Sequence, residues 1–257
     1  TFNSRTNHSR DVACNSKTDI EKMIFDTEPQ NWKELQNYVG QMFAECGFET
    51  EISKVVELVR GKKEIDVYTQ DIKSEYKPVT LVECKFWNKP ISQETIHSFR
   101  TVVSDFGANI GFIVSKNGFQ KGSYEAAEKT NIRLVTLKEL ETEYYSKWIK
   151  GMLAKYMPYA DRLFPYWDFP GKKIKDGGTI DFEIKELIHQ AYLPICKIGP
   201  WDNMMGFKRN YPLEIPILDD EFKIMGEEVI LSDREYFDFI EENKDRAYEQ
   251  FKRLYRE

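Results

Sequence analysis

The chain has 257 residues, of which 41% are hydrophobic and 31% charged, and its formal net charge is −6. This length allows one full domain with a sizeable core and a second, smaller one. The net acidity excludes a general polyanion binder, although a local basic patch can still bind nucleic acid. The longest apolar runs, such as residues 109–115, have the length of a strand, so we expect a soluble, cytoplasmic protein that does not bind membranes.

The cysteines and the N-terminal residues also indicate which class of protein this is. Four cysteines are scattered along the chain without a C-x-x-C pair, which indicates reduced thiols and no structural zinc site. Residues 1–30 lack the apolar run of a signal peptide, and we expect them to form a polar arm with a short helix near residues 20–25. The chain begins with Thr1 rather than Met, which leaves open that it is a shortened or processed form.

Between residues 31 and 141 the predicted elements alternate between helices and strands. Asn31 and Glu34 have the spacing of a capping box and open a helix whose apolar stripe ends before Gly47. The elements that follow are strands at 48–59, 63–69 and 78–87, a helix at 92–107, a strand at 109–115, a short helix at 123–129 and a strand at 131–137. This order predicts a mixed α/β sheet covered by helices on both faces.

After residue 141 the composition changes, and we place a domain boundary there. We expect an aromatic-rich helix around residues 144–156, a loop at 164–178, two or three short strands between 179 and 230, and a long final helix opened by Ser232 and Glu235. Residues 142–257 are therefore predicted to form an α+β accessory region. Its aromatic side chains, at helical spacing, are expected to be core residues rather than base-stacking ones; these are Tyr144, Trp148, Tyr156, Tyr166 and Trp167. Three lysines in "GKKIKDGG" indicate a solvated turn, with a DNA-backbone contact as the alternative.

The stretch "LVECKFWNKPIS" places an acid and a base in a strand that otherwise reads as buried. Alternate strand residues share a face, so Glu83 and Lys85 point the same way. Asp66 lies on the preceding strand, and the two carboxylates converge if these strands pair. They would repel each other and be costly to desolvate, unless a divalent cation such as Mg²⁺ binds between them. The plain alternative is a solvated salt bridge, because E-x-K is common on strands.

Six short pieces of sequence then follow one another in a particular order: "FAECGFE", "GKKEIDV", "VECKFW", "ISQETIHSFRTVV", "NIGFIVSKNGFQKGSYEAA" and "NIRLVTL". Together they resemble the Mrr-like restriction endonucleases of the PD-(D/E)xK nuclease superfamily. The resemblance covers about residues 31–140. It implies an α/β fold in which a restriction-endonuclease-like mixed sheet is flanked by helices, and it assigns residues 31–141 to the nuclease domain.

The resemblance also implies roles for individual residues. Asp66 and Glu83 would bind the metal, with the backbone carbonyl of Cys84 as a further ligand, and Lys85 would be the catalytic lysine. Relatives often carry a glutamate on the first helix, whereas this chain has Gln36, a neutral residue that would hold metal less firmly but could still orient a water. We expect Mg²⁺, with Mn²⁺ as a substitute. The expected DNA contacts are Lys89, Gln93, Lys116 and Asn117.

On this basis the sequence predicts a Mg²⁺-dependent endonuclease for double-stranded DNA, acting as a homodimer in restriction or another defence against foreign DNA. Two alternatives remain. The first is a nuclease-fold module that binds nucleic acid but is inactive or needs a partner, for which Gln36 is the main support. The second is an interaction protein whose acidic C-terminal half recruits a partner. Metal binding separates them, because a scaffold has no need to keep Asp66 and Glu83 together.

Overall fold

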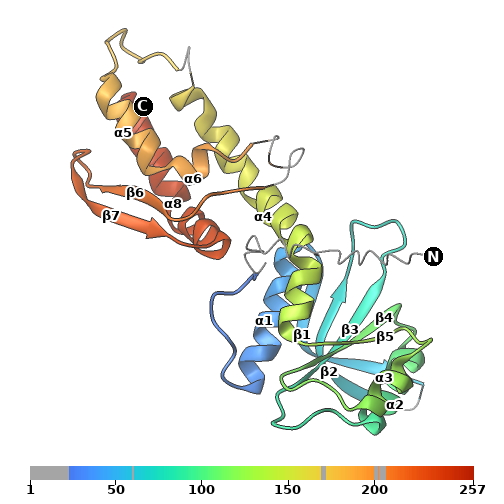
Figure 1. The fold of residues 1–257 in the computed structure, drawn as a ribbon. Helices are drawn as coiled ribbons and strands as arrows, with labels where there is room; N and C mark the ends of the chain where they lie inside the picture. Colours follow the sequence, from blue (N-terminus) through green and yellow to red (C-terminus); the bar gives the residue numbers. More distant parts are fainter. Residues whose placement is uncertain (1–22, 60, 169–171, 200–201, 203–206) are drawn as a thin grey trace, which may run out of the picture.

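The computed structural model describes residues 23–59, 61–168, 172–199, 202 and 207–257. A five-stranded mixed sheet with strand order β1-β2-β3-β4-β5 organises the first half of the chain (Figure 1). β1 pairs antiparallel with β2 and β2 with β3, whereas β3, β4 and β5 run parallel. The strands are β1 (Glu49–Leu58), β2 (Gly61–Gln70), β3 (Val79–Lys85), β4 (Ile110–Ser115) and β5 (Ile132–Val135).

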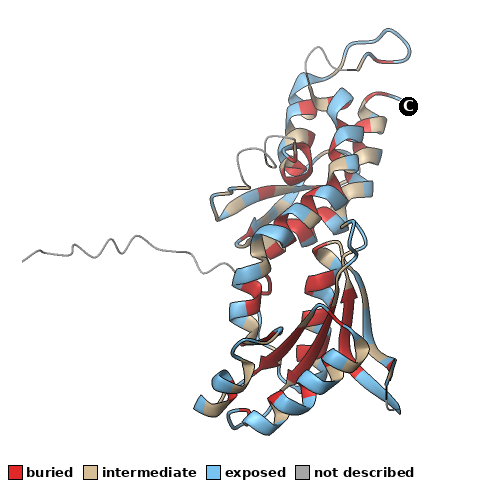
Figure 2. Cartoon of the chain, turned by 90° about the vertical axis from the view of Figure 1, so that its right-hand side faces the viewer, coloured by how far each residue is buried: buried red, intermediate tan, exposed pale blue. Residues whose placement is uncertain are grey.

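Helices cover both faces of this sheet, as the sequence predicts. One face packs against α1 (Trp32–Glu45) and the start of α4 (Leu137–Trp167), through a large core that includes Val82, Cys84 and Phe112. The other face packs against α2 (Gln93–Phe106) and α3 (Lys121–Ala127), through a smaller core that includes Leu81 and Ile113. Figure 2 shows the buried residues concentrated in the strands and on the inner sides of the helices.

The caps explain where the first helices begin and end. Asn31 accepts a hydrogen bond from the Glu34 backbone N–H and donates one to the Glu34 carboxylate, so α1 begins at the predicted capping box. α2 begins after Ser92 and ends at Gly107, which has a φ of 77° that glycine adopts without steric cost. Both helices therefore lie where the sequence pattern places them, and they fix the strands that carry the candidate site.

The second half of the chain contains α4, α5 (Phe182–Ala191), α6 (Leu193–Cys196), α8 (Asp233–Leu254) and the antiparallel pair β6 (Leu213–Leu218) and β7 (Ile224–Ile230). The sequence predicts two or three short strands between residues 179 and 230, and the structure describes two there, but it also has helices at 182–191 and 193–196 that the sequence analysis did not predict. Asp181 caps α5 by accepting from the N–H groups of Glu183 and Ile184, and the apolar residues of this segment face the helical core. Among the described residues of this region, the antiparallel pair at residues 213–230 supplies the predicted strands.

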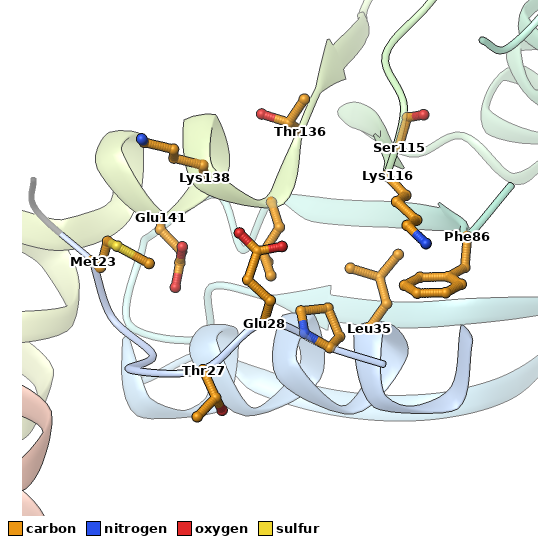
Figure 3. A pocket seen from close by; sticks show the side chains of 12 residues that line it. Met23, Thr27, Glu28, Leu35, Phe86, Ser115, Lys116, Thr136, Lys138 and Glu141 are labelled. Carbon is orange, nitrogen blue, oxygen red and sulfur yellow. The ribbon is translucent and has the colours of Figure 1, made fainter. Parts of the chain in front are cut away.

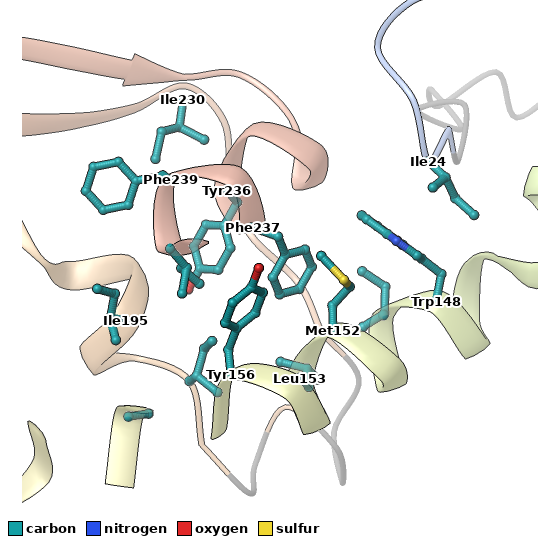
Figure 4. Close-up of a cluster of buried hydrophobic side chains, with 14 of the residues drawn as sticks. Ile24, Trp148, Met152, Leu153, Tyr156, Ile195, Ile230, Tyr236, Phe237 and Phe239 are labelled. Atoms are coloured by element: carbon teal, nitrogen blue, oxygen red, sulfur yellow. The ribbon is translucent and has the colours of Figure 1, made fainter. Parts of the chain in front are cut away.

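Helix α4 links the two halves. It runs unbroken from the sheet to the C-terminal helices, across the boundary that the sequence places after residue 141 (Figure 1). Trp148 and Tyr156 on α4 pack against Phe237 on α8, in one cluster shared with the core of the sheet (Figure 4). The division at residue 141 stays a prediction, and any such boundary would lie inside helix α4 rather than in a linker.

The segment before α1 is part of the core in its described residues. Ile24 and Phe25 are buried, and their backbone N–H groups donate to the carboxylate of Glu141 at 3.2 and 3.0 Å. Residues 23–25 are not helical, and the rest of the predicted short helix, with most of the predicted arm, lies outside the described residues. Within the described ranges, no helix is both long and apolar enough to cross a bilayer.

Candidate active site

The two carboxylates meet where strands β2 and β3 separate. The last paired residues there are Val67 and Val82, and one step further along the same register Asp66 stands opposite Glu83. Asp66 Oδ2 accepts a hydrogen bond of 2.7 Å from the backbone N–H of Cys84. Because the N–H and C=O of one strand residue point toward the same neighbouring strand, the Cys84 carbonyl also faces Asp66. The three predicted metal-binding groups thus lie together.

Glu83 is the centre of the charged cluster. Its side chain is 11% exposed, and its Oε1 accepts a hydrogen bond of 2.5 Å from Lys85 Nζ. Lys63 Nζ, on β2, lies 3.9 Å from the same oxygen. The second oxygen, Oε2, is buried and has no hydrogen-bond partner among the described residues. An unsatisfied carboxylate oxygen costs free energy in a buried position, which makes it a natural ligand for a cation.

The environment of Asp66 raises the pKa of its carboxyl group. Burial raises the pKa of Asp66, the Cys84 N–H works in the opposite direction, and the negative charge of Glu83 raises this pKa further. The thiol of Cys84 is fully buried and its pKa is also raised, mainly by burial. Cys84 is therefore a small core residue, as predicted, and its thiol does not serve as a nucleophile.

Gln36, on α1, forms hydrogen bonds to strands β1 and β2. Its side chain is completely buried, and its Nε2 donates to the backbone carbonyl of Asp66 at 2.7 Å and to Ser53 Oγ at 3.0 Å. Its Oε1 accepts a hydrogen bond of 3.2 Å from Lys33 Nζ. Gln36 thus contacts the backbone of the strand that carries Asp66 rather than the carboxylates themselves, and its part in catalysis stays a prediction. The carboxylate of Glu34 is engaged in the cap of α1, where it also accepts from the Gln30 N–H.

These donors fit one magnesium-like cation. Among the described residues there is no group of three or more His, Cys, Asp and Glu side chains that could hold a metal ion. Two carboxylates and a backbone carbonyl remain, all hard oxygen ligands. Mg²⁺ is commonly held by one or two carboxylates and keeps several waters, so this small set suits it. The unpartnered Oε2 of Glu83 is the observation in favour of such an ion.

The predicted DNA contacts lie on the loops that follow β3 and β4. Lys116 Nζ donates to Asn88 Oδ1 at 3.4 Å and lies 4.1 Å from the ring centroid of Phe86, so it joins the two loops. Lys89 and Asn117 are exposed nearby in sequence. Gln93 is exposed as well, and its Oε1 lies close to Gly122 of α3. None of these four side chains contacts the carboxylates, so their role in binding DNA stays a prediction.

Two residues near the site were missed by the sequence analysis. Trp87 is 42% exposed, and Lys85 Nζ lies 5.5 Å from the centroid of its ring. Lys63 was missed because strict alternation along β2 places it on the face opposite Asp66. Alternation fails there, since Ile65 joins the core under α2 whereas Val67 joins the core under α1. A left-handed Ser53 on the neighbouring strand, with a φ of 56°, marks the irregular position.

Other candidates have structural roles. Trp148, Tyr156 and Tyr166 are buried, so they are core residues rather than stacking platforms. Lys172, in the predicted lysine turn, forms an ion pair with Glu257 at 2.6 Å. A cavity of about 130 Å³ lies on the α1 face, below the start of α4 (Figure 3). Phe86, Lys116 and Glu141 line it, but none of the predicted catalytic residues does, so it is separate from the charged cluster.

The sheet order, the flanking helices and the fork between β2 and β3 define the class of this part of the chain, which is a restriction-endonuclease-like core. A comparison with family models agrees, because residues 28–143 match the model described as restriction endonuclease. This match confirms, for residues 28–143, the resemblance to Mrr-like restriction endonucleases found in the sequence. A comparison with curated proteins gave no significant match.

Three solved structures are similar to parts of the chain. A protein of unknown function, AF1548, is 23% identical with a TM-score of 0.35, and the match covers 40% of this chain and 57% of that one. The DNA modification-dependent restriction endonuclease AspBHI is 9% identical, with a TM-score of 0.31, covering 51% and 38%. The MspJI restriction endonuclease, in complex with a 27-mer oligonucleotide, is 15% identical, with a TM-score of 0.30, covering 46% and 27%. The chain thus spans little more than half of the first of these proteins and less of the others.

Proposed function

We propose that this protein is a metal-dependent endonuclease that hydrolyses phosphodiester bonds in double-stranded DNA. The observation that carries the proposal is the convergence of Asp66, Glu83 and Lys85 at the fork of β2 and β3, with one buried oxygen of Glu83 left without a partner. The family of residues 28–143 supports the same reading. Mg²⁺ is the proposed metal, Mn²⁺ a substitute, and the cytoplasm the proposed location.

The residues of the chain divide the chemistry between them. Asp66, Glu83 and the Cys84 carbonyl would hold a divalent cation, which lowers the pKa of water and offsets charge on phosphate oxygens. Lys85 orients the attacking water and stabilises the charge that develops on phosphorus substituents. The water oxygen forms the new P–O bond in line as the bond to O3′ breaks. The water gives up a proton to solvent and O3′ gains one, which leaves a 5′-phosphate and a 3′-hydroxyl.

The substrate would lie across the ends of β3 and β4. Lys89, Gln93, Lys116 and Asn117 surround that edge and can contact phosphates, which position DNA without reading its sequence. The described part of the chain offers one such cluster, and cutting both strands takes two. We therefore propose a homodimer, and restriction or another defence against foreign DNA as the biological role.

The test is cleavage of supercoiled plasmid by the wild type, with Mg²⁺, with Mn²⁺ and with EDTA, on methylated and unmethylated DNA. Lys85→Ala is the variant, and Lys62→Ala is its matched control, because Lys62 pairs with Glu57 at the exposed end of β2. We expect nicking or linearisation by the wild type and the control with metal, and none by Lys85→Ala. Cleavage that persists in EDTA, or in Lys85→Ala, would overturn the proposed mechanism.

One observation favours a second function. Gln36 takes the place of the glutamate that the resemblance implies, its amide binds the Asp66 backbone, and no third acidic side chain joins the two carboxylates among the described residues. The chain could then be a DNA-binding module of the same fold that is inactive or requires a partner for cleavage. The wild type would in that case shift DNA in a gel at low salt but leave the plasmid intact under all conditions of the test.

A further inference from the structure

Lys63 is the second cation of the site, and the proposed nuclease reaction does not yet use it. Its Nζ lies 3.9 Å from Glu83 Oε1, whereas Lys85 Nζ lies 2.5 Å from the same oxygen. The Lys85 side chain is 18% exposed and fully engaged with Glu83, while the Lys63 side chain is 43% exposed. Lys63 thus stands at the solvent side of the cluster, where a substrate would approach.

The charges of the site explain why a second lysine is needed. A phosphodiester brings one negative charge to Asp66 and Glu83, and the charge on its oxygens grows as water attacks. The two carboxylates and one carbonyl offer ligands for a single divalent cation, and no further group of metal-binding side chains exists among the described residues. One divalent cation and Lys85 balance the two carboxylates and the phosphodiester, but not the additional negative charge that builds on the phosphate oxygens as the attacking water loses its proton. A protein cation at the mouth of the site can supply the remainder.

Geometry also suits Lys63 to this task. A contact of 3.9 Å to a carboxylate that another lysine already pairs is weak, so Lys63 gives it up at little cost. Its ammonium is a compact charge on a flexible stem, which reaches a ligand by rotating its own side chain. The break in alternation along β2 turns Lys63 toward the carboxylates. Lys62, one residue earlier, pairs with Glu57 at 2.9 Å and is 67% exposed at the other side of the strand.

We infer that Lys63 binds a non-bridging oxygen of the scissile phosphate and stabilises the charge that builds there during attack. Lys63 is thus a catalytic residue that touches the substrate, in addition to Lys85. The inference rests on the proposed nuclease function and extends it by one substrate contact. No covalent step is added, because the ammonium keeps its proton throughout.

The experiment compares wild type, Lys63→Ala, Lys63→Arg and Lys62→Ala in two assays. Plasmid nicking with saturating Mg²⁺ gives the rate. Anisotropy of a fluorescent 20-base-pair duplex, with Ca²⁺ in place of Mg²⁺, gives the dissociation constant as a function of NaCl. Loss of one transition-state donor lowers kcat by about 10²- to 10³-fold, and loss of one phosphate contact lowers the salt slope by about 0.9. We expect both effects in Lys63→Ala, partial recovery in Lys63→Arg, and neither effect in Lys62→Ala.

Other outcomes overturn the inference in distinguishable ways. If Lys63→Ala nicks plasmid at the wild-type rate, Lys63 has no part in the reaction. If its rate falls while the salt slope stays at the wild-type value, Lys63 acts only by positioning Glu83. If Lys62→Ala lowers the nicking rate and the salt slope as much as Lys63→Ala does, the effect comes from the net charge of the protein and not from a contact made by Lys63. A wild type that neither binds nor cuts DNA removes the proposed function itself, and the inference with it.

Discussion

One buried ion pair joins α8 of the C-terminal half to α1 of the restriction-endonuclease-like core, and its loss has a predictable cost. Arg234 on α8 is 7% exposed and donates twice to Glu45 on α1, at 2.9 and 2.7 Å. Its Nε donates to the Ile24 carbonyl at 2.9 Å, and the Trp148 indole donates to Glu45 at 2.7 Å. Burial alone would raise the pKa of Glu45, but Arg234 and the hydrogen bonds from Gln41 and Trp148 together lower this pKa below its ordinary value.

We expect Arg234→Met to lower the free energy of unfolding by about 3–5 kcal/mol at pH 7, because it leaves the Glu45 carboxylate buried without its cation. The double variant Arg234→Met/Glu45→Met should recover most of this loss, because no isolated charge remains. The double variant should remain less stable than wild type by about 1 kcal/mol for each hydrogen-bonding group left without a partner. These groups are the Trp148 indole N–H and the Ile24 carbonyl. The pair is shielded from solvent, so 0.5 M NaCl should change these differences little.

Urea denaturation at pH 7, followed by far-UV circular dichroism, measures all four proteins of this cycle. The pH dependence gives a second check. Because the folded pKa of Glu45 is lowered, its contribution is present above the ordinary value of 4.5 and is lost as the pH falls through the folded pKa. The difference between wild type and Arg234→Met should therefore shrink below pH 4.5. Exposed ion pairs contribute at most about 1 kcal/mol to stability. If Arg234→Met lowers the free energy of unfolding by less than this at pH 7, the reasoning is refuted.

Three further predictions concern other parts of the molecule. Gly151→Ala should lower the free energy of unfolding by about 1–3 kcal/mol in urea, because its Cβ would lie 2.0 Å from the Glu45 carbonyl; Gly226→Ala, where a Cβ meets open space, should not suffer this overlap. Glu241→Gln should lower the free energy of unfolding by at most about 1 kcal/mol at pH 7, because this side chain is half exposed. Hydrogen bonds from neighbouring lysines lower the pKa of Glu241 to about 2. The difference in stability from wild type should therefore vanish as the pH falls from 4.5 toward 2. Gln36→Glu should lower the melting temperature without metal and increase the rise that Mn²⁺ produces, because a third carboxylate joins the site; an unchanged response to Mn²⁺ would count against the assigned metal position.

The sequence predicts the nuclease half well because its signals are local. Glu83 and Lys85 share a strand, and the apolar pattern of β3 and β4 marks both as inner strands of the sheet. The register that brings Asp66 opposite Glu83 follows once β2 and β3 are known to be neighbours in an antiparallel pair. The expected metal site therefore follows from two strands and a turn, and the structure brings its members together.

The remaining features depend on contacts between distant residues or on broken local rules. Arg234 and Glu45 are 189 residues apart, and nothing in either local sequence marks them as partners. The helix at residues 182–191 was missed because isoleucines are frequent in strands, whereas packing against the helical core decides its structure. Lys63 was missed because the alternation rule fails at one position in β2, beside the candidate site itself.

The most direct test of the central claim is the rate of nicking of supercoiled plasmid as a function of Mg²⁺ concentration, for wild type and Glu83→Gln. Glu83→Gln keeps the size of the side chain but removes the carboxylate whose buried oxygen lacks a partner. The account predicts saturable nicking by the wild type and no nicking by Glu83→Gln at any Mg²⁺ concentration. Equal rates for the two proteins would contradict it, because the fork of β2 and β3 would then not be where DNA is cut.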